Sequence, residues 1–208
     1  MATDRDSFKT SHIGPRLRQQ REQNGISLRE IARRIGVSPS LISQIERDKV
    51  NPSVITLYAL VRELGLTMGD LFAIEDGSEP GRTHSQSTLP VVGPDERAVI
   101  NLASGVRWER LTAERDGSVE FLLVTYDVGS ESCPADSLVT HGGREYGYVI
   151  SGRLGVRIGF DEYDLGPGNS ISFDSSSPHR LWALGDEPVT AIWVVVGRQS
   201  DHRLGSAG

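Results

Sequence analysis

The first third of the chain carries apolar residues three or four positions apart, which is the spacing of one buried helix face. Gly25, Gly36 and Gly65 follow these runs and are typical helix stop signals. Residues 13–75 are therefore predicted to form four helices and a short fifth. The residues that share a predicted inner face are Leu28, Ile31, Ala32 and Ile35, then Leu41, Ile42 and Ile45, then Val54, Leu57, Leu60, Val61 and Leu64.

Two of these helices have recognisable starts. Ser27 is followed three residues later by Glu30, the pattern of a capping box. Ser38 can cap the next helix, and Pro39 suits its first position, where a missing N–H is not needed. A short helix, a glycine turn and a second helix are the elements of a helix-turn-helix.

From Val91 the pattern changes to short strand-like runs separated by Gly, Pro, Asp and Ser, which predicts an all-β sandwich or barrel. Residues 76–90, DGSEPGRTHSQSTLP, lack apolar periodicity and are typical of a linker. We therefore expect an α + β protein of two domains, with helices over 9–75, a linker over 76–90 and a β-domain over 91–200.

Composition indicates a soluble globular protein, with 37% hydrophobic and 24% charged residues. No run approaches the roughly 18 apolar residues of a membrane helix, and the polar N-terminus lacks a secretory signal. Cys133 is the only cysteine, so an internal disulfide is impossible. These features predict a cytoplasmic protein that does not enter the membrane.

The net charge of −6 is unevenly divided along the chain. Residues 9–75 hold ten basic and seven acidic side chains, whereas residues 76–208 hold 11 basic and 19 acidic ones. Such asymmetry is compatible with a helical module that faces nucleic acid. Two unrelated solvated surfaces would give the same counts, so charge alone does not decide.

The pattern on the second helix of the helix-turn-helix separates a buried face from a polar one. Leu41, Ile42 and Ile45 take the inner face. Serine and glutamine on the outer face can reach base edges, while arginine and lysine mostly hold phosphates. The basic residues that flank this surface are Arg33, Arg34, Arg47 and Lys49.

The stretch ISLREIARRIGVSPSLISQIERDKVNPS closely resembles the XRE-type (Cro/C1-type) DNA-binding domain, a λ-repressor-like bundle of five helices, and the match covers about 60 residues. The resemblance implies that Arg21 and Glu46 form a structural ion pair. It also implies a double-stranded DNA operator, read by a homodimer because two half-sites multiply specificity. The base-reading residues implied by position are Ser38, Pro39, Ser40, Ser43 and Gln44.

The stretches SLVTHGGREYGYVISGRLGV and DLGPGNSISFDSSSPHRLWAL resemble the two motifs of the cupin superfamily, small jelly-roll β-barrels. His141, Glu145 and His179 match three ligand positions of that family, whereas Val139 stands where its first histidine would be. The resemblance implies that these three residues line one ligand pocket, to which we add Tyr148 as a further lining residue.

Two histidines and one carboxylate suit Fe(II), and zinc can occupy a similar set. The cofactor therefore stays open between one divalent metal (Fe, Zn, Mn or Ni) and no metal at all. In a metal-free pocket, the imidazoles would hydrogen-bond a small-molecule effector.

The main hypothesis is a sequence-specific DNA-binding transcriptional regulator, not an enzyme, whose cupin domain senses a small molecule or a metal. The alternative is a mononuclear iron enzyme resembling hydroxypropylphosphonate epoxidase, in which the helix-turn-helix is vestigial. A third possibility, a module for protein contacts alone, is disfavoured by the basic residues around the helix and by the polar pocket.

Overall fold

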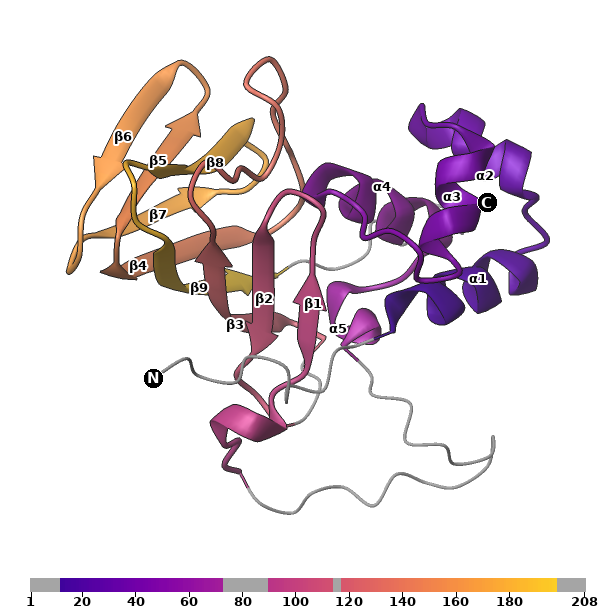
Figure 1. Cartoon of the computed structure of the whole chain (residues 1–208), viewed down its shortest axis with the longest axis horizontal. Helices are drawn as coiled ribbons and strands as arrows, with labels where there is room; N and C mark the ends of the chain where they lie inside the picture. The colour runs from indigo at the N-terminus through magenta and orange to yellow at the C-terminus, as the bar shows by residue number, and fades with distance from the viewer. Residues whose placement is uncertain (1–11, 73–89, 114–116, 198–208) are drawn as a thin grey trace, which may run out of the picture.

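The computed structural model describes residues 12–72, 90–113 and 117–197. A helical bundle (residues 13–71) lies beside a β-barrel (residues 99–196), as Figure 1 shows, and this confirms the predicted order of helices followed by strands. Apart from Pro90, the predicted linker lies outside the described residues, as do the outer ends of both predicted domains. The five helices are α1 (Ile13–Gln23), α2 (Leu28–Ile35), α3 (Pro39–Ile45), α4 (Val54–Leu64) and α5 (Met68–Leu71).

Side-chain caps and one glycine set the ends of α2 and α3. The Ser38 hydroxyl accepts a hydrogen bond from the backbone N–H of Leu41 at 3.1 Å, as a helix start requires. Gly36 has a φ of 73°, a left-handed conformation that ends α2 and turns the chain toward α3. Ser27 caps α2 through the N–H of Glu30, but the Glu30 carboxylate binds two arginines, so only the first half of the predicted capping box forms.

A buried ion pair joins α1 to the end of α3. Arg21 donates to both carboxylate oxygens of Glu46, from Nε at 2.6 Å and from Nη2 at 2.8 Å, and both side chains are buried. A third guanidinium donor reaches the carbonyl oxygen of Ile26 at 2.9 Å. This confirms the expected pair and fixes α3 against the rest of the bundle.

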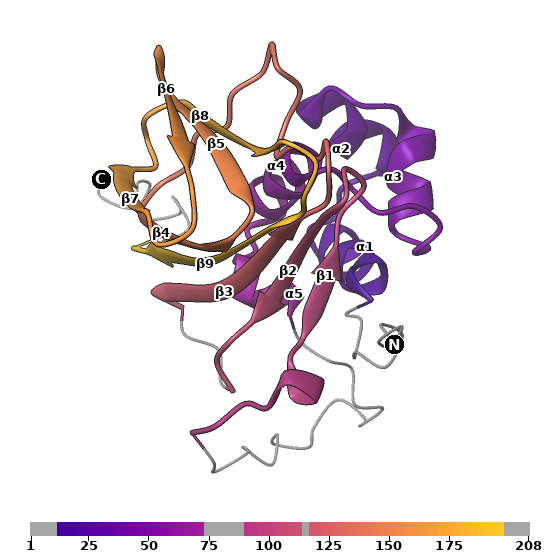
Figure 2. The same cartoon turned by 60° about the vertical axis from the view of Figure 1, so that its left-hand side comes forward.

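The β-barrel consists of two antiparallel sheets, with strand order β1-β2-β3-β9-β4-β7 in the larger and β6-β5-β8 in the smaller. Figure 2 shows the two sheets curving around a shared interior. Alternate residues of β4, β8 and β9 are buried, so one face of each strand points into the barrel. The strands are β1 (Val99–Asn101), β2 (Val106–Arg110), β3 (Val119–Tyr126), β4 (Arg144–Ser151), β5 (Arg153–Ile158), β6 (Asp161–Leu165), β7 (Ser170–Asp174), β8 (His179–Leu184) and β9 (Val189–Val196).

Helix α4 is one part of the bundle that meets the barrel. Both views place it between the barrel and helices α2 and α3 (Figures 1 and 2). The backbone N–H of Ala103 donates to the carbonyl oxygen of Pro52 at 2.9 Å, just before α4 begins. The ring of Tyr58 on α4 lies 5.7 Å from that of Trp108 on β2. Within the described chain, no helix combines the length and the apolar character needed to cross a membrane.

Removing one partner of the buried pair should destabilise the bundle strongly. We expect Glu46→Ala to lower the free energy of unfolding by about 3 kcal/mol or more, because Arg21 is left buried without its counter-charge. Glu63→Ala is the control, since Glu63 lies on α4 and forms only looser pairs with Arg34 and Arg62 among the described residues, at 3.8 and 3.9 Å. Chemical denaturation followed by circular dichroism measures both, and equal losses would contradict a special role for Glu46.

Candidate functional site

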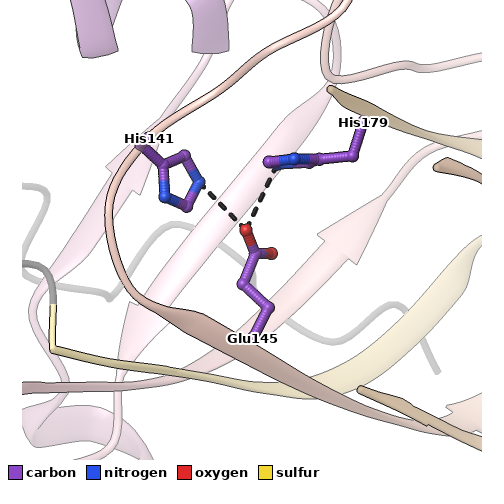
Figure 3. A group of neighbouring side chains, drawn as sticks. All are labelled: His141, Glu145 and His179. Carbon is purple, nitrogen blue, oxygen red and sulfur yellow. Dashed lines mark ion pairs between the residues drawn. The ribbon is translucent and has the colours of Figure 1, made fainter. Parts of the chain in front are cut away.

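Three polar side chains from separate segments converge inside the barrel. His141 precedes β4, Glu145 is the second residue of β4, and His179 begins β8. Nε2 of His141 lies 3.0 Å and Nε2 of His179 lies 3.2 Å from the same Glu145 oxygen, Oε1 (Figure 3). The turn before β4 uses Gly143 at a φ of 103°, which brings His141 back over the strand. We call these three residues the His–Glu–His cluster.

The other ring nitrogen of each histidine faces a backbone carbonyl. Nδ1 of His141 lies 3.1 Å from the carbonyl oxygen of Gly142, and Nδ1 of His179 lies 2.9 Å from that of Ser177. Because a carbonyl oxygen only accepts hydrogen bonds, each Nδ1 can donate to it, which turns each Nε2 toward Oε1 of Glu145. One ligand atom from each of the three residues lies within 4.8 Å of the other two, a spacing at which they could share one cation. The cluster therefore fits one divalent metal ion.

Burial and one indole hold the Glu145 carboxylate in place. Burial by itself would raise the pKa of Glu145, but the facing His141 and His179 outweigh it and hold that pKa well below its ordinary range. The indole N–H of Trp193 donates to the second oxygen, Oε2, at 2.6 Å. Glu145 thus stays ionised, with one oxygen oriented by Trp193 and the other directed at the histidines.

A glycine makes the Trp193 contact possible. Gly147 pairs with Trp193 across β4 and β9, and a Cβ atom at Gly147 would lie 2.2 Å from the indole ring. The ring therefore lies over Gly147 and reaches Glu145, which shares that face of β4. Trp193 was not among the site residues predicted from the sequence. An inner-face glycine two residues after the glutamate was the available signal, since glycine in a strand often marks a close approach.

The position of the missing family histidine is apolar and faces the cavity. Val139 is 6% exposed and lies beside His179, with which it exchanges two backbone hydrogen bonds of 2.9 Å. The cavity around the cluster has a volume of about 30 Å³ and is otherwise lined mainly by apolar and aromatic side chains. A metal held here would have three protein ligands and at least one open position.

Tyr148 does not belong to this cavity, which corrects its assignment to the ligand pocket. Residues along a strand alternate between faces, so Tyr148 points away from Glu145, three positions earlier. Its side chain is 49% exposed and lines a groove on the outer face of β4, β7 and β9 with Tyr146 and Ile171. Tyr58 of α4, which the sequence analysis did not consider, lines the cavity instead.

The proposed DNA-reading residues lie on the outer side of α3. Ser38, Pro39 and Ser40 are exposed, whereas Ser43 and Gln44 are half-buried. The Gln44 amide donates to the Ser40 hydroxyl at 3.3 Å. On the opposite side of α3, Ile42 and Ile45 are almost completely buried, so the helix presents one polar face.

The four proposed phosphate-binding residues fall into two classes. Arg33 and Arg34 both bind the Glu30 carboxylate, at 2.8 and 2.9 Å, and these bonds lower the Glu30 pKa to about 2. Arg47 and Lys49 are exposed, and no described carboxylate lies within ion-pair distance of either. Among the described residues, the Arg47 guanidinium bonds the backbone carbonyl of Ser43, at 2.9 Å.

Comparison with known proteins identifies both halves of the chain. Residues 17–71 match the family model described as helix-turn-helix, and residues 122–195 match that described as cupin domain. An uncharacterized HTH-type transcriptional regulator of Sinorhizobium fredii, y4dJ, is 34% identical over 64 residues, which cover 31% of this chain and 83% of that relative. This chain belongs to the XRE-type helix-turn-helix transcriptional regulators with a cupin domain.

Two further members of this regulator family match nearly the whole chain. The HTH-type transcriptional regulator PuuR of Escherichia coli is 29% identical over 169 residues, covering 81% of this chain and 85% of PuuR. The crystal structure of an HTH_3 family transcriptional regulator from Vibrio cholerae aligns at a TM-score of 0.62 with 25% identity. That alignment covers 91% of this chain and 96% of the Vibrio chain.

If Val139 occupies a ligand position in this XRE–cupin protein, a histidine there should complete the site. We expect Val139→His to raise zinc affinity by about tenfold or more, because closed zinc sites use four protein ligands. Competition with a chromophoric chelator measures the affinity, and the melting temperature checks that the larger side chain fits. Val128→His is the control, since Val128 is 53% exposed. Unchanged zinc binding in a folded Val139→His protein would mean that position 139 does not face the metal.

Glu30 should weaken DNA binding by occupying Arg33 and Arg34. We expect Glu30→Gln to raise the affinity for a random-sequence duplex and to steepen its salt dependence, because both arginines become available to phosphates. Glutamine suits the same helix position, so the cap at Ser27 should remain. Fluorescence anisotropy across a salt series measures both quantities. Glu22→Gln removes a similar exposed carboxylate from α1 and serves as control; an equal gain in that variant would make the effect one of net charge alone.

Proposed function

We propose that this chain is a sequence-specific DNA-binding transcriptional regulator whose cupin domain senses a divalent metal or a small molecule. The observation that supports DNA binding is the polar outer face of α3. The opposite face of this helix is held in the core by the buried Ile42 and Ile45. Such a helix can enter the major groove, where Ser40 and Gln44 are the side chains best placed to read bases. Arg47 and Lys49 flank this face and would hold phosphates.

A dimer is the form in which this surface would read an operator. One α3 helix spans few base pairs, so two copies on adjacent half-sites are needed for useful specificity. The relatives PuuR and y4dJ are both named HTH-type transcriptional regulators, which supports the same role for this chain. Operator binding would place the protein in the cytoplasm.

The sensing half of the proposal rests on the His–Glu–His cluster. His141, Glu145 and His179 would hold one ion of Fe, Zn, Mn or Ni, and Trp193 would keep the carboxylate oriented. A bound divalent ion would offset the negative charge of the buried Glu145 carboxylate. Metal binding would also tie the turn before β4, β4 itself and β8 to one another, and so make this end of the barrel more rigid.

The iron-enzyme alternative shares the same cluster, because two histidines and one carboxylate are also the ligands of non-haem iron oxygenases. An enzyme of that kind would need stoichiometric iron and turnover of an organic substrate, and it would not need a DNA-reading surface. We favour the regulator because α3 presents a polar face. Just after α3, Arg47 and Lys49 have no carboxylate partner among the described residues. We infer that the protein is not an enzyme.

The proposal predicts different effects for two residues of the DNA surface. Operator fragments are first obtained by genome-wide pulldown of DNA bound to the protein. We then expect Arg47→Ala to weaken binding to all sequences and to reduce the salt slope by about 1, because one phosphate contact is lost. Gln44→Ala should lower discrimination between operator variants by about 1–3 kcal/mol at the base that it reads.

Fluorescence anisotropy on matched duplexes measures both effects. Arg153→Ala is the control, because Arg153 is an exposed arginine on β5, where it pairs with Asp164. If the operator affinities of Arg47→Ala and Gln44→Ala both equal that of the parent protein, the α3 surface is not the DNA interface. Iron retained in stoichiometric amount together with substrate turnover would favour the enzyme alternative.

A further inference from the structure

The cavity of the His–Glu–His cluster is lined by residues from both parts of the chain. Val54 and Tyr58, on one face of α4, form one wall, and barrel residues such as Trp108 and Trp193 form the rest. The cavity is therefore not completed by the barrel alone. A helix of the DNA-binding bundle closes one side of it.

Tyr58 makes the closest connection between the bundle and the cluster. Its ring centroid lies 5.2 Å from that of His141 and 5.7 Å from that of Trp108. His141 in turn contacts Glu145 through Nε2. A shift of His141 would thus displace Tyr58 directly, because the two rings are packed against each other and no flexible linker lies between them.

A large movement of Tyr58 would also move α3, whose outer face is the proposed DNA-reading surface. Leu57 and Leu60, its neighbours on α4, are buried with Ile31 of α2 in a core that continues into the barrel, but α4 packs more extensively against α1 and α2 than against any strand. Close-packed helices move as a body, because separating them would open cavities in that core. Displacement of α4 from the barrel would therefore carry α3 with it.

The size of the cavity decides which occupants require that displacement. A volume of about 30 Å³ holds roughly two waters, since one water needs about 10–15 Å³. A bare divalent ion fits this space, whereas an organic molecule of more than a few atoms does not fit while Tyr58 stays in place.

We propose that Tyr58 couples the cavity to the DNA-binding bundle. An organic effector can enter only when Tyr58 and α4 leave the barrel, so binding of such an effector and docking of the bundle exclude each other. A divalent ion binds with the bundle docked. This inference rests on the proposed function in one respect, that the cavity is the sensing site. Effector binding and docking of the bundle influence each other reciprocally. A change in one equilibrium can therefore be detected by measuring the other.

Hydrogen exchange on the full-length protein tests the contact without any ligand. We expect His141→Ala to speed exchange of the first turns of α4 about three- to tenfold, the effect of losing one aromatic contact. Tyr58→Ala should have the same effect on β2, where Trp108 lies. Tyr58→Phe, which keeps the ring, should speed exchange of β2 less than Tyr58→Ala does. Tyr163→Ala is the control, because Tyr163 lies on β6 and is 44% exposed.

Binding of 4-methylphenol, which has the shape of the tyrosine side chain, tests the exclusion. Tyr58→Ala should bind it in the enlarged cavity, with quenching of tryptophan fluorescence, whereas the parent protein and Tyr58→Phe should not. Zinc should bind both Tyr58→Ala and the parent protein. Equal binding of 4-methylphenol to parent and Tyr58→Ala proteins would overturn the proposal. So would unchanged α4 exchange in a His141→Ala protein that circular dichroism shows to be folded.

These outcomes are separable from failure of the proposed function. Operator affinity, measured on the same proteins by anisotropy, reports whether the chain binds DNA at all. A parent protein that binds no operator but shows the exchange and exclusion effects would contradict the regulator and leave the Tyr58 contact intact. A parent protein that binds operator but shows neither effect would contradict only the contact.

Discussion

A charged carboxylate buried inside an apolar barrel is the constraint around which the C-terminal half is organised. Ionised Glu145 could not remain in that environment without compensation. Three groups stabilise the carboxylate charge: an indole N–H from β9, an imidazole from the turn before β4 and another imidazole from the start of β8. Each contributor is positioned by backbone hydrogen bonds of its own, such as those between Val139 and His179. The electrostatic requirement of one residue thus explains the placement of several segments.

The helical bundle solves a different electrostatic problem. For the proposed function it must present positive charge to DNA, and α3 must be held firmly enough to keep its register in the groove. The buried pair of Arg21 and Glu46 provides the firmness, with no net charge at the surface. Glu30 binds the two arginines of α2, so the positive charge that remains without a described carboxylate partner lies near the end of α3, at Arg47 and Lys49. This arrangement favours specific docking over general attraction to any polyanion.

Much of the fold could be predicted from the sequence because its signals are local. Helical periodicity, Ser38 as a cap and the glycine stops gave five helices, and short apolar runs gave the strands. The cluster of His141, Glu145 and His179 required the family resemblance, since no local rule brings together residues almost 40 positions apart. Tyr148 was misplaced although the signal was available, because Glu145 and Tyr148 are three positions apart on one strand and alternation puts them on opposite faces. Tyr58 could not be found from sequence, because its role depends on how the bundle packs against the barrel.

The close approach of Trp193 to Gly147 has a consequence for how relatives of this chain diverge. No side chain larger than hydrogen is compatible with the indole at that point, and the same holds for Gly155 beneath Trp182. Positions 147 and 193 should therefore change together over evolution, a bulkier residue at one accompanying a smaller residue at the other. Lineages that make this exchange lose the indole donor to Glu145, and their cupin pockets are free to acquire a different chemistry.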